Sequence, residues 1–550
     1  MNRKEPSWLK NAVFYQIYPQ SFCDSNGDGI GDIQGIISKL DYIKDTGFNA
    51  IWLNPIYESP FKDAGYDVSD YYKVAPRYGT NEDLRQLFAE AKKRGIRVIL
   101  DIVAGHTSTE HEWFKASCKA EKNKYSNYYI WNEDWLDDSD GLNMINGYAE
   151  RNGNFAINFF STQPALNYGF ADPDPRKKWQ LPTDHPDVQA VGEELRKLME
   201  FWLQQGCDGF RVDLAPSLIK KDKGRKAVIQ FWQKFRKIFD EKYPEAALIA
   251  EWSYAPQALK AGFHIDFMIF CGTSAYTSLF RNEPERDMFQ YIPKKVFYEI
   301  DGYDYELKNQ NSFFDRGGHG DINQFMTTYL RHYQETKENG YIAMVSSNHD
   351  MPRINDNRNA LDLELIFAFI MTMPGTPFIY YGDEIGMRNI KGLVSVEGGY
   401  TRTQARTPMQ WDTTANAGFS TAPASKLYLP IDPDEARPNV QSMLADDNSL
   451  LNRFKNILKI RKAHESLQAD GDFEFIPVTN AANVLAFIRK SANEKLLMLF
   501  APGADGGEFS FKLDTAQTPT AIRAVNMELS CRDGIATCKT SNSGYGIFKI

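Results

Sequence analysis

The sequence lacks long apolar runs. No stretch of its 550 residues approaches the roughly 20 apolar residues that are needed to span a bilayer. The first residues, Met1–Pro6, have no apolar core of the kind found in signal peptides. These absences predict a protein that does not insert into a membrane. They favour a cytoplasmic location, with a periplasmic or secreted location as the alternative if a signal peptide has been removed.

An excess of basic residues is also lacking. The formal net charge is −9, and Lys and Arg do not gather into a long basic run. Because contacts to phosphate groups need clustered Lys and Arg, nucleic acid is excluded as an expected partner. The chain is expected to act as a monomer or a small homo-oligomer.

Cysteine is scarce and scattered. The six cysteines show no CxxC spacing, which argues against a cysteine-based metal cluster and predicts buried free thiols. In an oxidising compartment, a disulfide between Cys531 and Cys538 is the alternative. The cysteines are Cys23, Cys118, Cys207, Cys271, Cys531 and Cys538.

Aromatic residues, in contrast, are plentiful. The chain has 36 Phe, 28 Tyr and 10 Trp, which together make up 13% of it. Most such rings are expected in the core, and the rest can serve as platforms for the apolar faces of sugars. With 42% hydrophobic and 25% charged residues, the composition is typical of a soluble globular protein, and the length predicts two or three domains.

Short β-branched runs alternate with helical stretches along the chain. The helices include Ile33–Thr46 and Asn81–Arg94, the second with Thr80 as a predicted N-cap and Asp83 in its first turn. Eight strands that alternate with helices predict an α/β fold, a (β/α)₈ barrel. The predicted strands are Ala12–Tyr18, Ala50–Leu53, Val98–Ile102, Gly209–Val212, Leu248–Ala250, Phe267–Phe270, Ala343–Ser346 and Phe378–Tyr381.

Two intervals depart from this alternation. Residues 107–185 are polar, aromatic and rich in Asn and Asp, which predicts a domain inserted after the third strand. After about Asp470, short alternating runs predict a small antiparallel β domain. The predicted domains are therefore a barrel in residues 1–106 and 186–470, an inserted B domain in 107–185, and a C-terminal β domain in 471–550.

Polar clusters follow the third, fourth, fifth and seventh predicted strands. The carboxyl ends of barrel strands are where catalytic groups of this fold lie. A single Asp after a strand is more often a helix cap or a turn residue, but four clusters in strand order favour an active site. The clusters contain Asp101 with His106, Arg211 with Asp213, Glu251, and His349 with Asp350.

Paired carboxylates are the groups that cleave a glycosidic bond with retention of configuration. One attacks the anomeric carbon and the other, protonated, donates to the leaving oxygen from about 5–5.5 Å away. Arg211 lies two residues before Asp213, on the same face of a strand, and favours an ionised nucleophile there. Glu251 follows an apolar strand and precedes Trp252, where partial desolvation favours a protonated acid. Asp350 is predicted as a third carboxylate that bridges sugar hydroxyls.

With these clusters in this order and spacing, essentially the whole chain is similar to glycoside hydrolase family 13, the α-amylase family. The resemblance implies a catalytic barrel, a B domain after the third strand and a C-terminal β domain. It also implies that Asp213 is the nucleophile, Glu251 the acid/base and Asp350 the transition-state stabiliser. Arg211 matches the arginine that orients the nucleophile, and His106 and His349 match histidines that bind hydroxyls in the −1 subsite. No organic cofactor is expected.

Further segments resemble the oligo-1,6-glucosidase and α-glucosidase branch of that family. Gln163–Asn167 resembles its QPDLN signature, with Ala165 in place of the Asp. The resemblance implies that Asp63 binds sugar hydroxyls, Tyr66 stacks on the −1 ring and Arg406 pairs with Asp63. Such an Asp–Arg clamp would block the pocket beyond −1. It implies exo-cleavage of one glucosyl unit from a short α-linked oligosaccharide or disaccharide.

A separate loop after the first strand has the spacing of a metal site. Oxygen ligands at alternate positions, with glycines for the tight turn, are typical of Ca²⁺ loops. Gly35 stands where an EF-hand has its last Glu, so the loop instead resembles the structural metal loop of the glucosidase branch. Ca²⁺ is the predicted ion, with Mg²⁺ or a metal-free turn as alternatives. The predicted ligands are Asp24, Asn26, Asp28, Ile30 and Asp32.

Some residues depart from the family's pattern and leave the substrate open. Gly105 stands where Asn is usual, and Leu214 occupies a position often linked to 1,6 or 1,4 preference. A transglycosylase or isomerase of the sucrose isomerase or trehalose synthase type is therefore an alternative. An endo-acting α-amylase or neopullulanase-like hydrolase is disfavoured by the clamp. A non-catalytic family member is disfavoured by the carboxylates.

Overall fold

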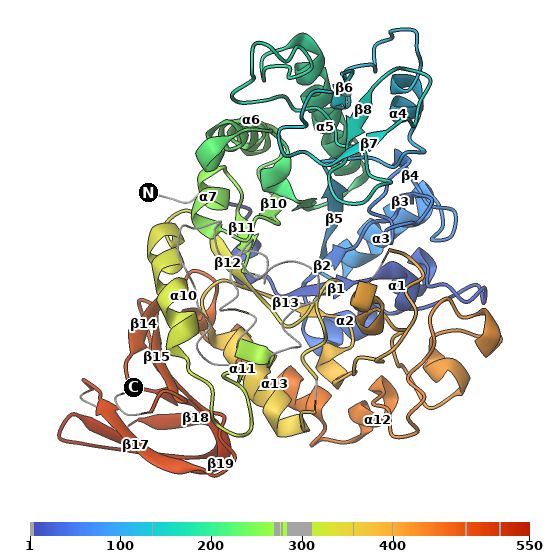
Figure 1. The fold of residues 1–550 in the computed structure, drawn as a ribbon. Helices are drawn as coiled ribbons and strands as arrows, with labels where there is room; N and C mark the ends of the chain where they lie inside the picture. The colour runs from blue at the N-terminus through green and yellow to red at the C-terminus, as the bar shows by residue number, and fades with distance from the viewer. Residues whose placement is uncertain are drawn as a thin grey trace.

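Eight parallel strands close into a barrel at the centre of the molecule (Figure 1). The computed structural model describes residues 5–134, 136–268, 276, 279–282, 311–355, 357–398, 400–478, 481–515 and 519–550. Around the barrel the strands follow the order β1, β13, β12, β11, β10, β9, β5, β2. Their bounds are β1 Phe14–Ile17, β2 Ala50–Leu53, β5 Arg97–Val103, β9 Gly209–Asp213, β10 Ala247–Ala250, β11 Ile265–Phe267, β12 Tyr341–Val345 and β13 Thr376–Tyr380.

The barrel strands are apolar because both of their faces are covered. Nearly every strand residue is buried, as expected for parallel strands that have side chains inside the barrel and helices outside it. Closure comes from β13, which pairs with β1 through Phe14 and Phe378. The sixth strand lies earlier than the predicted Phe267–Phe270, whose last two residues fall outside the described part of the chain.

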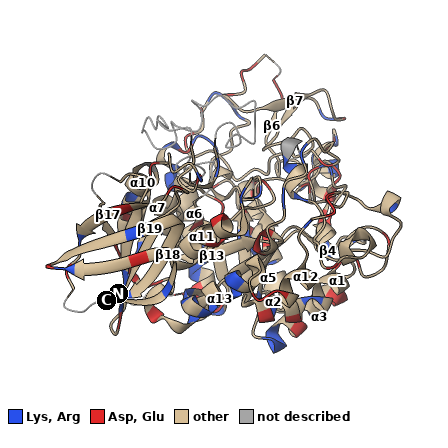
Figure 2. Cartoon of the chain, turned by 90° about the horizontal axis from the view of Figure 1, so that it is seen from below, with Lys and Arg blue, Asp and Glu red and all other residues tan. Residues whose placement is uncertain are grey.

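Helices surround the barrel and carry charges of both signs, as Figure 2 shows for α2 and α3. The predicted N-cap of α3 is confirmed, since Thr80 and Asp83 form a capping box. The predicted helix Ile33–Thr46 is two helices that meet at Lys39. The helices are α1 Ile33–Ser38, α2 Leu40–Thr46, α3 Asn81–Lys93, α5 Pro186–Gln205, α6 Lys226–Lys242, α7 Ala255–Lys260, α10 Asn323–Thr336, α11 Ala360–Thr372, α12 Val440–Ala445 and α13 Leu450–Ala463.

The chain between β5 and α5 forms the upper part of the molecule in Figure 1. It contains α4 (Glu112–Ser117) and a three-stranded sheet with a small core of its own. An isolated bridge between His106 and Ala165 joins the return of this segment to the end of β5. The sheet strands are β6 Trp131–Asn132, β7 Met144–Asn146 and β8 Asn154–Ala156; a separate pair, β3 Tyr57–Glu58 and β4 Asp70–Val74, lies between β2 and α3.

An antiparallel sheet completes the chain after the barrel, which confirms the predicted fold class. Cys531 and Cys538 lie on β18 and β19 as free thiols, each paired across the sheet with a residue other than the other cysteine. Cys23, Cys118 and Cys207 are free thiols as well; Cys118 and Cys531 are partly exposed, and Cys271 lies outside the described residues. The strands are β14 Asp472–Ile476, β15 Leu485–Lys490, β16 Lys495–Ala501, β17 Gly507–Lys512, β18 Thr520–Arg532 and β19 Ile535–Lys549.

A buried carboxylate joins this sheet to the barrel. Glu364 on α11 is 1% exposed and forms ion pairs with Arg453 of α13 and Arg523 of β18. It also accepts a hydrogen bond of 2.8 Å from the hydroxyl of Tyr545 on β19. The side chain of Glu364 therefore connects helices α11 and α13 to strands β18 and β19 of the C-terminal sheet.

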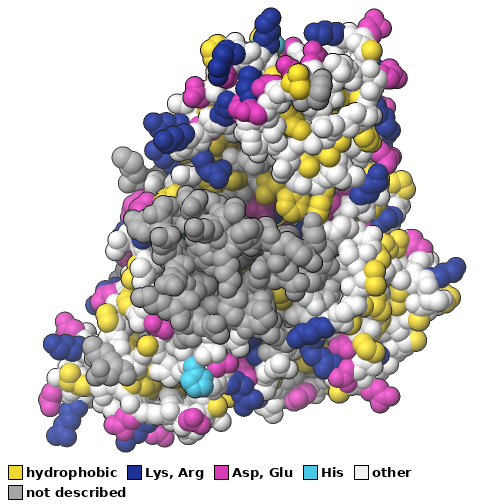
Figure 3. Space-filling model, viewed as in Figure 1, with side chains coloured by type: hydrophobic (Ala, Val, Ile, Leu, Met, Phe, Trp, Pro, Cys, Tyr) yellow, Lys and Arg dark blue, Asp and Glu magenta, His cyan; other side chains and the backbone are white. Residues whose placement is uncertain are grey.

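The surface of the described part mixes charges of both signs. In Figure 3, Lys and Arg side chains alternate with Asp and Glu along the edges of the face that is shown. Among the helices that the structure describes, none is long and apolar enough to cross a membrane.

Candidate active site

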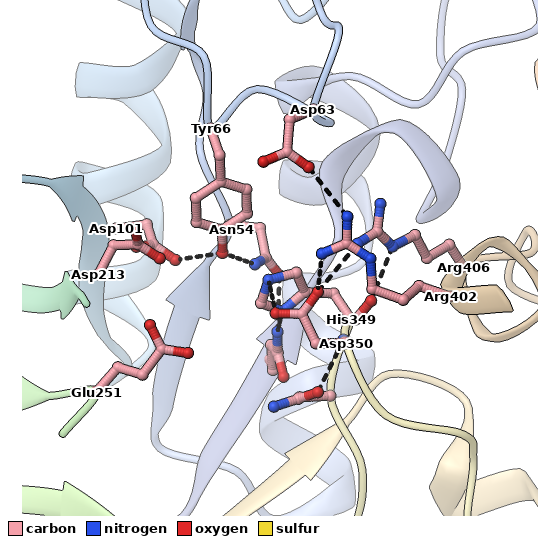
Figure 4. Close-up of polar contacts among 12 residues, drawn as sticks. Asn54, Asp63, Tyr66, Asp101, Asp213, Glu251, His349, Asp350, Arg402 and Arg406 are labelled. Atoms are coloured by element: carbon pink, nitrogen blue, oxygen red, sulfur yellow. Dashed lines mark hydrogen bonds and ion pairs between the residues drawn. The ribbon is translucent and has the colours of Figure 1, made fainter. Parts of the chain in front are cut away.

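The polar clusters after the barrel strands meet at one end of the barrel (Figure 4). Asp213 is the last residue of β9, and Glu251 directly follows β10. Asp101 lies in β5, and Asp350 lies five residues beyond the end of β12. Because all eight strands run parallel, their carboxyl ends face the same side, which brings together residues that are far apart in sequence.

Arg211 is the centre of one half of the site. Its Nη1 lies 2.9 Å from Oδ1 of Asp101 and 2.8 Å from Oδ1 of Asp213. Its Nη2 lies 2.9 Å from Oε2 of Glu251. A single guanidinium, 2% exposed, therefore binds three carboxylates and orients the two that the sequence predicts as the catalytic pair.

The turns after β9 and β10 position these carboxylates. Leu214 has a φ of 41°, and its N–H donates a hydrogen bond of 2.9 Å to Oε2 of Glu251. Ser253 also has a positive φ, 62°, in the turn after Glu251. The N–H groups of Trp252 and Ser253 donate to Oδ1 of the buried Asp266 on β11. Strained backbone on both sides thus fixes where Glu251 points.

Burial dominates the electrostatics of this half. It raises the pKa of Asp213 well above its ordinary value, the Glu251 carboxylate adds to the rise, and the Arg211 guanidinium opposes it. Burial likewise raises the pKa of Asp101 to about 6, against the effect of Arg211. The sequence predicts that Arg211 favours an ionised Asp213. The guanidinium does act in that direction, but burial outweighs it.

Asp350 is the centre of the other half. Its Oδ1 lies 2.7 Å from Nη1 of Arg402 and 3.1 Å from Nη2 of Arg406, and its Oδ2 lies 3.2 Å from Nε2 of His349. Burial lowers the pKa of His349 well below its usual value, so the imidazole is neutral near neutral pH. Burial alone would raise the pKa of Asp350, but the surrounding groups hold it well below its usual range. The groups that lower the pKa of Asp350 are His349 and the Arg402 and Arg406 guanidiniums.

Tyr66 lies between the two halves. Its ring stacks on that of His349, with 5.1 Å between centroids and an angle of 8° between planes. Its hydroxyl donates to Oδ2 of Asp101 at 2.9 Å and accepts from Nδ2 of Asn54 at 3.0 Å. Figure 4 shows this ring standing between the Asp213 side and the Arg402 side of the site. The tyrosine is therefore held rigidly at both its face and its hydroxyl.

The predicted Asp63–Arg406 pair is wrong in one partner. Asp63 binds Arg402, with Oδ1 3.1 Å from Nη2, and its Oδ2 accepts from Nε2 of Gln163 at 2.7 Å. Arg406 instead donates from Nε to the carbonyl oxygen of His349 at 2.8 Å, which turns its guanidinium toward Asp350. Arg402 lies four residues earlier, in the short helix Tyr400–Ala405, and from there it reaches both Asp63 and Asp350.

His106 lies beneath the loop that carries Tyr66. Its Nε2 is 3.1 Å from the carbonyl oxygen of Tyr66, and its Nδ1 is 3.1 Å from Nδ2 of Asn158. The ring is 1% exposed, and burial lowers its pKa to about 4. The neutral imidazole thus connects Asn158, in the segment between β5 and α5, to the loop that carries Asp63 and Tyr66, called the pocket loop below.

The predicted metal loop is closed by its own hydrogen bonds. Asp24 accepts from the N–H groups of Asn26, Gly27 and Gly29, and the side chains of Asn26 and Asp28 each accept from the residue two positions on. Among the described residues, no three His, Cys, Asp or Glu side chains form a group that could hold a metal. The predicted metal ligands still suit a hard cation by chemical type, because they are carboxylate and amide oxygens at alternate positions.

Sequence reasoning missed several residues of the site. Arg402 stands in a segment without clear periodicity, and only its spacing before Arg406 would have pointed to it. Asp101 was placed in a cluster but given no role, although it anchors Arg211 and Tyr66. Asn54 directly follows β2, which is the same strand-end position that marks the other clusters.

Comparisons with known proteins agree with this geometry. The family model described as Alpha amylase, catalytic domain, matches residues 16–470. The glucan 1,6-alpha-glucosidase of Streptococcus pneumoniae is 33% identical over 539 residues, which cover 90% of this chain and 91% of that protein. The trehalose synthase/amylase TreS of Mycolicibacterium smegmatis is 32% identical over 519 residues, 89% of this chain and 82% of that protein.

A solved structure shows the same fold over almost the whole length. The trehalulose synthase MutB from Pseudomonas mesoacidophila MX-45 superposes with a TM-score of 0.79 at 27% identity, covering 98% of this chain and 99% of that one. The chain therefore belongs to glycoside hydrolase family 13, the α-amylase family, in the branch that contains the oligo-1,6-glucosidases, and it is a glycoside hydrolase.

Proposed function

We propose that this enzyme is a retaining, exo-acting α-glucosidase that hydrolyses terminal α-glucosyl units of short oligosaccharides or disaccharides. The observation that carries the proposal is the ion-pair network in which Arg402 binds both Asp63 and Asp350. Asp63 and Arg402 are buried and Asp350 is partly exposed, and the three side chains lie across Tyr66 from the Asp213 and Glu251 carboxylates. A glucan cannot extend through this ion-pair network, so a terminal unit is the substrate that fits.

In the proposed first step an oxygen of Asp213 attacks the anomeric carbon while Glu251 donates its proton to the glycosidic oxygen. The bond to the leaving sugar breaks, and a glucosyl ester on Asp213 forms. Arg211 supports this arrangement because it binds both carboxylates and opposes the effect of burial on Asp213. One guanidinium that spans the pair is consistent with the close spacing of a retaining mechanism.

In the proposed second step Glu251 takes a proton from water, and the water oxygen attacks the anomeric carbon. The ester bond to Asp213 breaks and glucose leaves with its α configuration. Asp350 is the proposed stabiliser of the positive charge that develops on the sugar ring in both steps. The Arg402 and Arg406 guanidiniums keep it ionised for that role.

The remaining residues are proposed to bind the terminal glucose unit. Asp63 and its partner Arg402 face the 4- and 6-hydroxyls, Tyr66 provides the stacking surface, and His349 binds a hydroxyl beside Asp350. Arg406 orients Asp350, and His106 supports the Tyr66 loop from below. This assignment keeps Asp63, Tyr66 and His349 as residues that bind the sugar and adds Arg402, whereas His106, Arg211 and Arg406 position other groups of the site.

Isomerisation or transglycosylation is the second candidate, because two of the similar proteins are named for synthase activities. A mutant of MutB has been solved with the substrate sucrose, and the same structural likeness extends over nearly the whole of this chain. Such enzymes use the same glycosyl-enzyme and differ in whether water or a sugar hydroxyl resolves it. The two candidates therefore predict different products from one site.

Product analysis separates these candidates. We would incubate the enzyme with maltose, isomaltose, trehalose, sucrose, nigerose and soluble starch and identify the products by chromatography. Glucose release from at least one disaccharide, with starch inert, is expected. An isomeric disaccharide without net glucose would replace the hydrolase by an isomerase, and maltooligosaccharides from starch would replace it by an endo-acting enzyme. Asp213→Asn serves as the inactive control.

We also propose that the loop Asp24–Asp32 binds Ca²⁺, with Mg²⁺ as the alternative. The side chains of Asp24, Asn26, Asp28 and Asp32 and the carbonyl of Ile30 would hold the ion. Support comes from Asp24 and Asp32, which are buried carboxylates at 6% and 4% exposure. The loop is anchored to a distant segment, because Ser420 donates to Oδ2 of Asp24 at 2.6 Å. The proposed role of the ion is structural.

A further inference from the structure

Gly105 leaves a space beside the end of β5 that another segment fills. A Cβ atom at position 105 would lie 2.7 Å from Nδ2 of Asn158, closer than real Cβ contacts come. The φ of Gly105 is not in the left-handed region, so the backbone would accept a side chain. The obstacle to a larger residue here is therefore the amide of Asn158 and not the local conformation.

Asn158 has defined partners on both ends of its amide. The ammonium of Lys220 can only donate, and it lies 3.5 Å from Oδ1 of Asn158 while it also donates to the carbonyl of Ser217 at 2.7 Å. This places Nδ2 toward Nδ1 of His106, at 3.1 Å. Since the amide N–H donates, Nδ1 must accept and the proton of His106 is on Nε2, which donates to the Tyr66 carbonyl.

The turn that contains Asn158 also contacts the pocket loop at a second point. The N–H of Asn158 donates to the carbonyl of Gln163 at 3.0 Å, so the two residues close one turn. The amide of Gln163 donates to Asp63, three residues before Tyr66 in the pocket loop. The turn therefore supports this loop at Asp63 directly and at Tyr66 through His106.

We propose that Asn158 is a positioning residue that fixes the His106 ring under the Tyr66 loop and that it takes the place of a side chain at position 105. Its role in catalysis rests on the proposed function of that loop. The exclusion between Asn158 and a side chain at 105 does not, since it depends on packing alone. The inserted segment thus supplies a group that the end of β5 lacks.

The test is a double-mutant cycle at positions 105 and 158. Asn158→Ala is expected to lower kcat/KM at least tenfold on the disaccharide that the enzyme cleaves best, and Asn152→Ala, at an exposed asparagine of the same segment, is expected to leave it unchanged. Gly105→Ala should be harmful in the parent and neutral in the Asn158→Ala background. Gly105→Asn should be more harmful still alone, and combined with Asn158→Ala it should restore kcat/KM to within about threefold.

Two readouts keep the inference independent of the activity. Thermal unfolding should show the same non-additivity, with Gly105→Ala lowering the midpoint only when Asn158 is present. Imidazole ¹⁵N spectra should show His106 protonated on Nε2 alone in the parent and on both nitrogens in Asn158→Asp, because the carboxylate accepts from Nδ1 while the Tyr66 carbonyl still accepts from Nε2. Additive losses, or an unchanged tautomer with normal kcat/KM in Asn158→Ala, would overturn the proposal. Non-additive unfolding in a chain inactive on all sugars would overturn only the proposed function.

Discussion

The carboxylates of the site differ in what surrounds them: Asp101 and Asp213 are buried, whereas Glu251 and Asp350 are partly exposed. Asp213 shares Arg211 with two other acids, whereas Asp350 contacts a neutral histidine and two arginines, of which only Arg402 is shared, with Asp63. Burial raises the pKa of Asp213 against one shared guanidinium, whereas His349 and two guanidiniums outweigh burial and lower the pKa of Asp350. The site thus holds Asp350, which its neighbours keep charged, beside Asp213, whose charge depends on Arg211, a partner that it shares with two other acids.

Replacing Asp213 tests the proposed nucleophile. Asp213→Asn keeps the shape of the side chain but cannot form the glucosyl ester, so kcat should fall by on the order of 10³-fold or more with folding intact. Asp208→Asn is the matched control, because Asp208 directly precedes the same strand and pairs with Arg97 at its opposite end. Turnover within tenfold of the parent in Asp213→Asn would remove Asp213 from that role.

At the scale of elements, the buried Glu384 joins three parts of the barrel. It lies in a short helix after β13, and its Oε1 accepts from the hydroxyls of Tyr15 on β1 and Tyr42 on α2 at 2.6 and 2.7 Å. Burial raises the pKa of Glu384 to about 7, although these hydrogen bonds oppose the rise. The folded pKa therefore lies above the unfolded value, near 4.3.

This shift predicts a pH-dependent loss of stability. A carboxyl with a raised folded pKa stabilises the fold at pH below its unfolded pKa, and that contribution is lost as pH rises through the folded value. From about pH 4.3 to 7 the loss amounts to at most about 3.8 kcal/mol, at about 1.4 kcal/mol per pKa unit. The Tm of the parent relative to Glu384→Gln should therefore fall across this range, and a constant difference would contradict the prediction.

The loop Asp24–Asp32 gives a second prediction at this scale. If it binds Ca²⁺ only when folded, millimolar Ca²⁺ should raise Tm by several degrees over an EDTA-treated sample. Asp28→Ala should abolish this rise in Tm, because it removes one of the proposed ligands. Asp28 is an exposed loop carboxylate outside the catalytic pocket. Equal midpoints in Ca²⁺, Mg²⁺ and EDTA would show that the loop closes without a metal.

A helix or strand could be predicted from the sequence where all of its residues have the same environment. Fully buried strands such as Ala50–Leu53 are apolar throughout, so the sequence locates them. The break at Lys39 was missed because the apolar spacing continues through it into α2. Strand ends predict where Asp213 and Glu251 lie, whereas the pairing of Asp63 with Arg402 joins residues 339 positions apart in loops without periodicity.

At the scale of the whole molecule, Glu364 links the C-terminal sheet to the barrel. Glu364→Ala would leave Arg453 and Arg523 without their shared partner. Both arginines are partly exposed, so the expected loss is about 1–3 kcal/mol and not the 3–5 kcal/mol of a fully buried pair. Tm should fall by several degrees while kcat/KM at 25 °C stays unchanged.

The control for this prediction is another ion pair of the same sheet. Glu508 on β17 pairs with Lys539 of β19, and both side chains are more than half exposed. Glu508→Ala should therefore leave Tm within about a degree of the parent. If Glu364→Ala and Glu508→Ala change Tm equally, Glu364 does not link the C-terminal sheet to the barrel.

The way the barrel closes has a consequence for how the protein is made. Strand β13 pairs with β1 on one side and β12 on the other, so it is the last piece of the ring and the one that removes both open edges. A nascent chain on the ribosome carries β1 and β12 with unpaired backbone until Thr376–Tyr380 has emerged. Arg402 emerges later still, so catalytic competence arrives only after the ring has closed.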